Sequence, residues 1–262
     1  MSRLSRVKRS IKHQLPLPLA DAILMFKYRN QKVEGYEDYS AAVQGGRGLE
    51  IGGPSTVFKT ILPVYQAAKT LDGVNFGERT VWEGGIKSGL KYRYLATRVG
   101  QQFIADATDL GSIESTMYDF VLSSNCLEHV ANPIRALLEW RRVLRTGGIL
   151  VLVLPKKAAN FDHRRPITTL EHLLDDFNKK TGEDDLTHFE EIMALHDLAR
   201  DPPAGSIEQF RRRSADNFVN RTLHHHVFDW STILPLLAQA GFDVVRTSET
   251  PTDYYALAQR RE

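Results

Sequence analysis

Histidine side chains that can move protons gather in the second half of the chain. Seven of the nine histidines lie at or beyond position 163. A neutral imidazole, with an ordinary pKa near ~6.5, is well matched to take a proton from a hydroxyl group at neutral pH. We rank His163 first and His226 second as a general base, with Arg164 and His224 as residues that bind an acceptor. His129, after a buried strand, is a third candidate whose role could be limited to capping or packing.

A glycine turn follows the first buried strand of the chain. The segment 49–53 (LEIGG) runs from apolar residues into Gly52–Gly53, and Asp72 lies twenty residues after Gly52. In a doubly wound sheet such a turn brings backbone N–H groups to a ligand, and an acidic residue about 20 positions later binds ribose hydroxyls. The pattern predicts a nucleoside ligand. The Glu50 carboxylate would repel the phosphates of a dinucleotide, whereas it suits a ligand with an ammonium group.

Three further segments follow in order: FIADATDL at 103–110, YDFVLSSNCLEHV at 118–130 and RRVLRTGGIL at 141–150. Together with LEIGG, they resemble the motifs of the class I S-adenosylmethionine-dependent methyltransferases, of the methyltransferase type 11-like family. The resemblance implies methyl transfer, S-adenosylmethionine as cofactor, and adenine binding by Asp106. The turn departs from the family at Gly53-Pro54-Ser55, and the gap from Asp72 to Asp106 is long. The residues expected to bind the cofactor are Glu50, Gly52, Gly53, Asp72, Asp106, Ala107, Asn125 and Cys126.

The acceptor is less determined than the cofactor. We expect a small molecule or glycan, with O-methylation of a sugar or related hydroxyl as the first reading and a phenol, quinone-like or lipid acceptor as the alternative. A non-catalytic binding module of the same fold and a nucleotide-sugar or NAD-dependent Rossmann enzyme stay open, although Glu50 disfavours the last.

A divalent metal site is an alternative that we do not favour from sequence. Histidines near Asp175, Asp176, Asp184 and Asp185 would suit a hard or borderline cation, but capping and solvation explain these acids equally well. Glu128–His129 has the spacing that binds metal in some relatives, yet Asn125 replaces the leading acid. We expect no metal and activity that survives chelation.

The pattern of apolar runs predicts an α/β fold with a doubly wound, mainly parallel Rossmann-like sheet and a helical insertion after the fifth strand. Residues 1–45 form a basic arm and lead-in, and 46–262 form the methyltransferase domain, with a flap at 73–102 and an acceptor-site insertion at 156–230. Helices are expected at 56–68, from Pro133 onward, and at 169–180, 188–200, 207–221 and 229–240. Strands are expected at 48–52, 67–71, 102–105, 118–123, 149–154, 244–249 and 254–259.

The composition of the chain limits which kinds of binding partner are expected. The chain has 262 residues, one cysteine and a net charge of +2, which favours a reducing compartment and argues against a dedicated nucleic-acid binder. Arg3, Arg6, Lys8, Arg9 and Lys12 form a solvated basic arm that could make weak contact with a membrane surface. No run reaches ~18 apolar residues. We expect a cytoplasmic protein with no nucleic-acid partner, and the sequence leaves the oligomeric state open.

Overall fold

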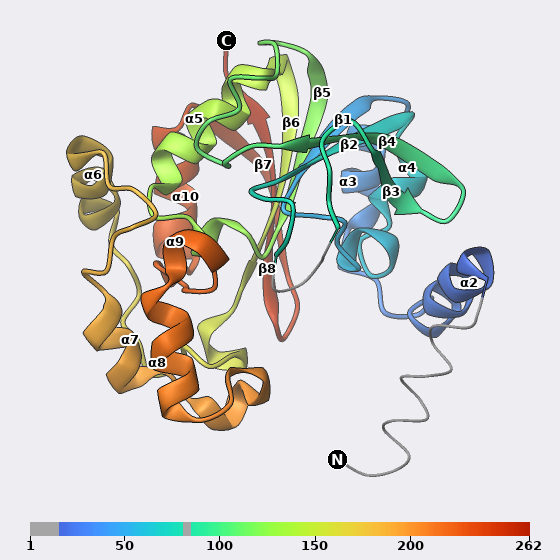
Figure 1. Cartoon of the computed structure of the whole chain (residues 1–262). Coiled ribbons are helices and arrows are strands. Elements are labelled where there is room, and N and C mark those ends of the chain that lie inside the picture. Colours follow the sequence, from blue (N-terminus) through green and yellow to red (C-terminus); the bar gives the residue numbers. More distant parts are fainter. Residues whose placement is uncertain (1–15, 81–84) are drawn as a thin grey trace.

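An eight-stranded sheet forms the centre of the computed structural model, which describes residues 16–80 and 85–262 (Figure 1). The strand order is β3-β4-β2-β1-β5-β6-β8-β7, with β4, β2, β1, β5 and β6 parallel and with β3 and β8 antiparallel to their neighbours. This confirms the predicted Rossmann-like α/β fold. The strands are β1 (Arg47–Ile51), β2 (Thr70–Asn75), β3 (Lys91–Leu95), β4 (Arg98–Ile104), β5 (Tyr118–Ser124), β6 (Leu144–Pro155), β7 (Phe242–Glu249) and β8 (Asp253–Arg260).

Helices cover both faces of the sheet. One face packs against α5 and α10 through Trp140, Leu236 and their neighbours, and the other against α3 and the turns that follow β1 through Tyr39 and Phe58. Helices α6 to α9 lie together at one side of the molecule, and α2 lies at the opposite side (Figure 1). The helices are α2 (Leu17–Lys27), α3 (Tyr36–Val43), α4 (Val64–Ala67), α5 (Pro133–Val143), α6 (Leu170–Lys179), α7 (Phe189–Leu195), α8 (Ile207–Ala215), α9 (Asn217–Asn220) and α10 (Trp230–Gln239).

Strand β1 lies between β2 and β5, so the chain reverses its direction of travel across the sheet at this point. Open α/β sheets bind their ligands outside the carboxyl ends of the strands at such a switch point. The turn after β1 and the ends of β2, β4 and β5 therefore bound the region where a ligand is expected.

Helices α6 and α10 lie close to their predicted ranges, whereas the predicted helix at 207–221 is divided into α8 and α9. Thr169 and Asp229 cap α6 and α10, and Ser206 with Gln209 forms a capping box at the start of α8. Thr187 does not cap α7, because its hydroxyl donates to Asp185 instead. That helix is accordingly shorter than predicted and ends at Leu195, and a 3₁₀ turn follows at Leu198–Arg200.

Two expectations for the first half need correction. The predicted helix at 56–68 is replaced by a 3₁₀ turn at Val57–Lys59 and the single-turn helix α4, which Pro63 immediately precedes. The predicted flap at 73–102, expected as an inserted loop or small hairpin, is corrected in its bounds: it begins inside β2, and β3 with most of β4 forms the hairpin, which pairs onto the sheet edge. Buried aromatic side chains explain this hairpin, since Tyr92 and Tyr94 pack into the second core.

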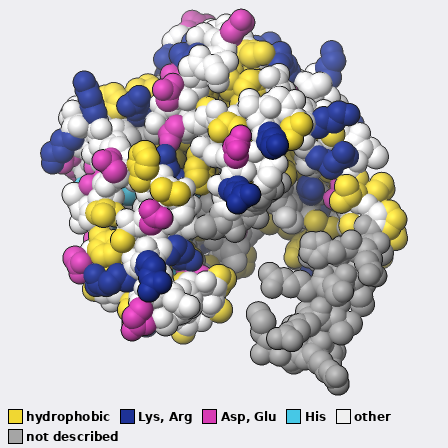
Figure 2. Space-filling model, viewed as in Figure 1, with side chains coloured by type: hydrophobic (Ala, Val, Ile, Leu, Met, Phe, Trp, Pro, Cys, Tyr) yellow, Lys and Arg dark blue, Asp and Glu magenta, His cyan; other side chains and the backbone are white. Residues whose placement is uncertain are grey.

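Helix α2, in the N-terminal part of the described chain, is an exception to this packing. Helix α2 has no buried residue and exposes Leu17, Leu19, Ile23 and Phe26, which Figure 2 shows as a group of apolar side chains. The predicted basic arm at Arg3–Lys12 lies outside the described residues. Within 16–80 and 85–262, no helix is long and apolar enough to cross a membrane.

Candidate active site

A cavity of about 540 Å³ opens at the switch point of the sheet. This volume falls within the range of small-molecule sites, roughly 300–1,000 Å³. Its wall combines the turn after β1, the ends of β2, β4 and β5, and two residues of the insertion. The described residues that line it are Ile51, Gly52, Gly53, Pro54, Val74, Asn75, Phe76, Thr80, Ala105, Asp106, Ala107, Asn125, Cys126, His129, Val130, Glu183 and Arg221.

The glycine turn forms one wall because two of its positions exclude larger residues. Gly52 has a φ of +81°, which L-residues with a side chain rarely adopt. A Cβ at Gly53 would lie 2.2 Å from the carboxyl carbon of Glu50. The backbone of the turn therefore faces the cavity directly, as a closely approached ligand requires.

Glu50 supports this turn from behind and does not line the cavity. Its carboxylate accepts hydrogen bonds from the hydroxyls of Tyr65 (2.5 Å) and Tyr92 (2.6 Å) and from the backbone N–H of Ser55 (3.0 Å). Complete burial raises the pKa of Glu50, although these three donors oppose the rise. The sequence predicts that Glu50 contacts an ammonium group of the ligand. In the structure, its carboxylate instead accepts hydrogen bonds from residues of the protein itself.

Asp72 also lies outside the cavity lining, and its predicted place beside Asp106 is corrected. β2 continues three residues past Asp72, which pairs with Leu49 in the middle of the sheet. Its carboxylate accepts from Arg47 (3.0 Å), Tyr118 (2.9 Å) and the backbone of Gln101 (2.8 Å). The residue at the carboxyl end of β2 is Asn75, which lines the cavity.

The other six predicted cofactor residues, Gly52, Gly53, Asp106, Ala107, Asn125 and Cys126, all line the cavity. Among the described residues, Asp106 accepts hydrogen bonds from the backbone and hydroxyl of Thr108 (2.8 and 2.7 Å) and forms an ion pair with Arg221 (3.0 Å). A carboxylate has about four acceptor positions, so one remains for an amino group of a ligand. Burial raises the pKa of the Cys126 thiol to about 12, which makes this residue a packing group and not a nucleophile.

Arg221 joins the insertion to the sheet across the cavity. Its guanidinium contacts Asp106 at 3.0 Å and Glu183 at 2.9 Å, and it lies 5.5 Å from the centre of the Phe76 ring. Glu183 is itself held by the backbone N–H of Ala131 at 3.0 Å. The cavity thus contains an ion pair network that spans the fold, and neither Arg221 nor Glu183 was anticipated from sequence.

A group of ionisable side chains stands behind the cavity wall at His129. Its Nδ1–H donates to the Leu223 carbonyl at 3.0 Å, which makes Nε2 the basic nitrogen of the ring. The ring packs edge to face against His224, with centres 4.5 Å apart. His224 in turn contacts Asp162 at 2.5 Å. One ligand-type atom each from Glu128, His129 and His224 lies within 4.8 Å of the others.

The pKa values in this group diverge. Burial, followed by the charge of His224, holds the pKa of His129 well below its ordinary value. Burial opposes protonation of His224, but the Asp162 carboxylate raises the pKa of that imidazole. Burial also raises the pKa of Glu128 to about 7. These pKa directions favour a protonated His224 beside a neutral His129. Neighbouring groups whose pKa values are shifted apart in this way are typical of proton-transfer sites, where one acts as an acid and the other as a base.

The two histidines ranked first from sequence are not in the cavity lining. His163 contacts Asp197 at 2.9 Å, and Arg164 contacts the same carboxylate at 3.4 Å. His226 is buried, with Nε2 3.3 Å from the Ala131 carbonyl. His224, predicted to bind the acceptor, reaches the cavity only through its contact with His129.

The sequence contains signals for some of the cavity residues, but not for all of them. Asn75 and Phe76 would follow from extending the second strand through the apolar Val74. His129 was named from its place after the fourth predicted strand. By contrast, Arg221 ends the short helix α9 in a left-handed conformation, with a φ of +54°, and no local pattern marks it as a cavity residue.

Comparison with known proteins gives a family for part of the chain. A family model described as a methyltransferase domain matches residues 87–152, which include Asp106, Asn125 and His129. A search of curated proteins finds no match.

Many solved structures are similar. One is a candidate S-adenosylmethionine-dependent methyltransferase from Listeria monocytogenes, with 16% identity, 87% of this chain and 96% of that chain covered, and a TM-score of 0.49. Another is a candidate methyltransferase from Bacillus halodurans, with 13% identity, coverage of 87% and 98%, and a TM-score of 0.49. A third is an S-adenosylmethionine-dependent methyltransferase from Mesorhizobium loti, with 15% identity, coverage of 87% and 99%, and a TM-score of 0.46.

Because these three TM-scores lie below 0.5, the assignment depends on the family match and on the ordered motifs. The matched segment supplies the ends of β4 and β5 that line the cavity. Residues 87–152 therefore match a methyltransferase domain, and the ordered motifs around this segment indicate S-adenosylmethionine as the methyl donor.

Proposed function

We propose that the protein methylates a hydroxyl group of a small molecule, with a sugar or polyol as the first acceptor class. The observation that carries this proposal is the place of His129, a neutral imidazole in the wall of the cavity. A hydroxyl that attacks a methyl group must lose its proton, and an imidazole within hydrogen-bond reach can accept it.

The residues of the cavity divide between cofactor and acceptor. S-adenosylmethionine supplies the electrophilic methyl group when bound. The backbone of Gly52–Gly53 and the remaining acceptor position of Asp106 would hold it, and Asn75 lies at the strand end where ribose-binding residues stand in this fold. The acceptor would then enter from the side of Arg221 and the insertion, with its hydroxyl directed to His129 Nε2.

The surroundings of His129 suit a proton acceptor. Its Nδ1–H is fixed by the Leu223 carbonyl, so the ring keeps one orientation and one tautomer. Glu128 lies within 4.8 Å and would stabilise the imidazolium that forms. Positioning donor and acceptor together would supply much of the rate, and general base catalysis adds typically 10²–10⁴-fold.

One observation favours a phenol as a second acceptor class. The lowered pKa of His129 weakens it as a base, and a phenol, with a pKa near ~10, gives up its proton more easily than a sugar hydroxyl.

An acceptor screen with matched variants tests the proposal. Release of S-adenosylhomocysteine is measured with sugars, polyols and phenols, and turnover is then compared for wild type, His129→Ala and His163→Ala. We expect His129→Ala to lower kcat by about 10²–10⁴ with little change in cofactor affinity, because the base acts only in the reaction step. His163→Ala, outside the cavity lining, should keep kcat within about twofold. Equal turnover of both variants on the identified acceptor would remove His129 from the mechanism.

A further inference from the structure

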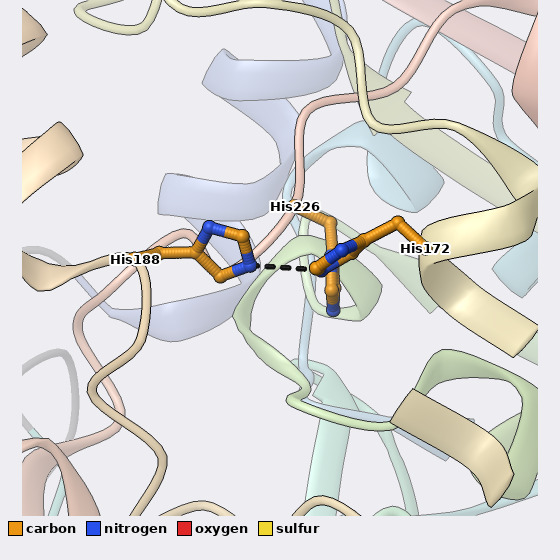
Figure 3. A group of neighbouring side chains, drawn as sticks. All are labelled: His172, His188 and His226. Atoms are coloured by element: carbon orange, nitrogen blue, oxygen red, sulfur yellow. Dashed lines mark hydrogen bonds between the residues drawn. The ribbon is translucent and has the colours of Figure 1, made fainter. Parts of the chain in front are cut away.

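We propose that His172, His188 and His226 form a binding site for one divalent transition-metal ion, with Zn²⁺ as the best match, separate from the cavity. Within the described residues, one nitrogen from each ring lies within 4.8 Å of the others. Figure 3 shows the three rings converging from different segments. This goes against the expectation of no metal drawn from the sequence, and it does not depend on the proposed reaction.

The distances suit a metal after a small adjustment. His172 Nε2 and His188 Nε2 lie 2.9 Å apart. Zn–N bonds of about 2.0–2.1 Å in a tetrahedral site place two nitrogens roughly 3.3 Å apart. His172 and His188 are only partly buried, so both side chains have room to rotate toward that spacing.

Two buried polar atoms at the same place lack a hydrogen bond within the described residues. His226 Nδ1 is one, and Asp176 Oδ2, which has ion-pair contacts with His172 and His226, is the other. Such atoms are costly and usually indicate an unseen partner such as an ion or water. The Asp176 carboxylate lies 3.1 Å from His172 Nε2 and 3.8 Å from His226 Nε2, and its other oxygen accepts from Thr181. A cation bound by the three rings would therefore have a negative charge beside it.

The supporting contacts resemble those that orient metal-binding imidazoles. Metal-bound histidines commonly donate their second ring N–H to a backbone carbonyl or a carboxylate. His226 Nε2 lies 3.3 Å from the Ala131 carbonyl, and Asn132 Nδ2 donates to the backbone oxygen of Asp176 at 3.1 Å. Three imidazoles with one nearby carboxylate favour Zn²⁺ over hard cations such as Mg²⁺ or Ca²⁺, which prefer oxygen ligands.

The second histidine group is a weaker candidate. Ligand-type atoms of Glu128, His129 and His224 also lie within 4.8 Å of each other. Two of its ring nitrogens already have partners, because His129 Nδ1 donates to the Leu223 carbonyl and His224 Nδ1 contacts Asp162. We therefore place the ion only in the cluster of His172, His188 and His226.

Such an ion would stabilise the fold of the insertion. His172 lies on α6, His188 immediately precedes α7, and His226 lies in the segment before α10. The backbone N–H of His226 donates to the Glu128 carbonyl at 3.3 Å, next to the wall that contains His129. Binding would join three segments of the insertion and its return to the domain, and would fix the wall of the cavity from behind.

The test uses untagged full-length protein, stripped with a chelator and dialysed. Zn²⁺ is titrated against a chromophoric chelator, Co²⁺ absorption reports the ligand geometry, and thermal unfolding is followed with and without Zn²⁺. Wild type should bind one equivalent and gain in melting temperature, with a tetrahedral Co²⁺ spectrum. His172→Ala and His188→Ala should lose at least 100-fold in affinity and lose the thermal gain, and Asp176→Asn should lose about 10–100-fold.

His163→Ala is the matched control, since this histidine also contacts an insertion carboxylate but lies outside the cluster. It should bind Zn²⁺ as wild type does. Absence of a stoichiometric site in wild type, or equal affinity in His172→Ala and His188→Ala, would overturn the proposal. His172 and His188 are partly exposed, so these variants should fold, and thermal unfolding without metal confirms that they do.

Discussion

Glu50 illustrates at the scale of one residue how a side chain can serve a site that it does not line. Its carboxylate collects three donors beneath the glycine turn, and Gly53 has no space for a Cβ against it. The turn is thus held by hydrogen bonds to a fully buried charge-bearing group. Hydrogen bonds to charged groups contribute about 1.5–3 kcal/mol each, so this network is a large part of the local stability.

A prediction follows for Glu50→Gln. All three neighbours donate to Glu50, and an amide would place its NH₂ group against a donor, so we expect a loss of about 1–3 kcal/mol in the free energy of unfolding. Because burial raises the pKa of Glu50, the folded state holds a proton above the pH at which the unfolded chain releases it. The contribution of Glu50 to stability should therefore fall as pH rises above about 4.5, so the difference in stability between wild type and the variant should change with pH in that direction.

Urea unfolding between pH 4.5 and 8 measures both effects, with the exposed Glu114→Gln as control. The control should keep the wild-type stability and pH dependence. A Glu50→Gln protein that matches wild type at every pH would show that the carboxylate does not support the turn.

At the scale of elements, Arg221 connects the end of α9 to the sheet. Its contacts with Asp106 and Glu183 are half-buried, whereas the pair of Arg211 on α8 with Glu190 on α7 is exposed. Exposed pairs contribute little, and a buried charge left without its partner is costly.

We predict that Arg221→Met lowers the free energy of unfolding by about 1–3 kcal/mol, because it leaves two carboxylates at the cavity without their cation. Amide hydrogen exchange should also become faster around Glu183 and α9. Arg211→Met should change stability by less than about 0.5 kcal/mol. If both variants behave alike, the contacts of Arg221 do not hold the insertion to the sheet.

Local patterns predicted the parts of the site that depend on neighbours in sequence. The turn at Gly52–Gly53 and the segment around Asp106 were found because strand, glycine and acid follow each other directly. Asp72 was misplaced because the length of β2 is set by its pairing with β1 and β4, which sequence spacing does not contain. Arg221 and Glu183 meet Asp106 only after the insertion folds back over the sheet, so no short motif could indicate them.

The histidines show the same limit in another form. The sequence shows that the histidines are concentrated after position 163, but it does not show which of them lie together in the fold. Folding placed His129 in the cavity wall, His163 beside Asp197 and His172, His188 and His226 together. These outcomes depend on which elements pack beside one another.

In the whole molecule, one cavity is the proposed site of both methyl donor and acceptor. Cavity and family match coincide at the ends of β4 and β5, where Asp106 and Asn125 stand. The insertion completes the wall through Arg221 and Glu183. The central claim is therefore that S-adenosylmethionine and its product bind at Asp106 and not at Asp72.

Calorimetric titration of S-adenosylhomocysteine into wild type, Asp106→Asn and Asp72→Asn tests this claim most directly. We predict one site in wild type and a loss of about 10–100-fold in affinity for Asp106→Asn, which removes a charge-assisted hydrogen bond to the adenine amino group. Asp72→Asn should keep its affinity within about threefold once its folding is confirmed, because its partners are Arg47, Tyr118 and Gln101. Binding of NAD without binding of S-adenosylhomocysteine, or a larger loss for Asp72→Asn than for Asp106→Asn, would contradict the account.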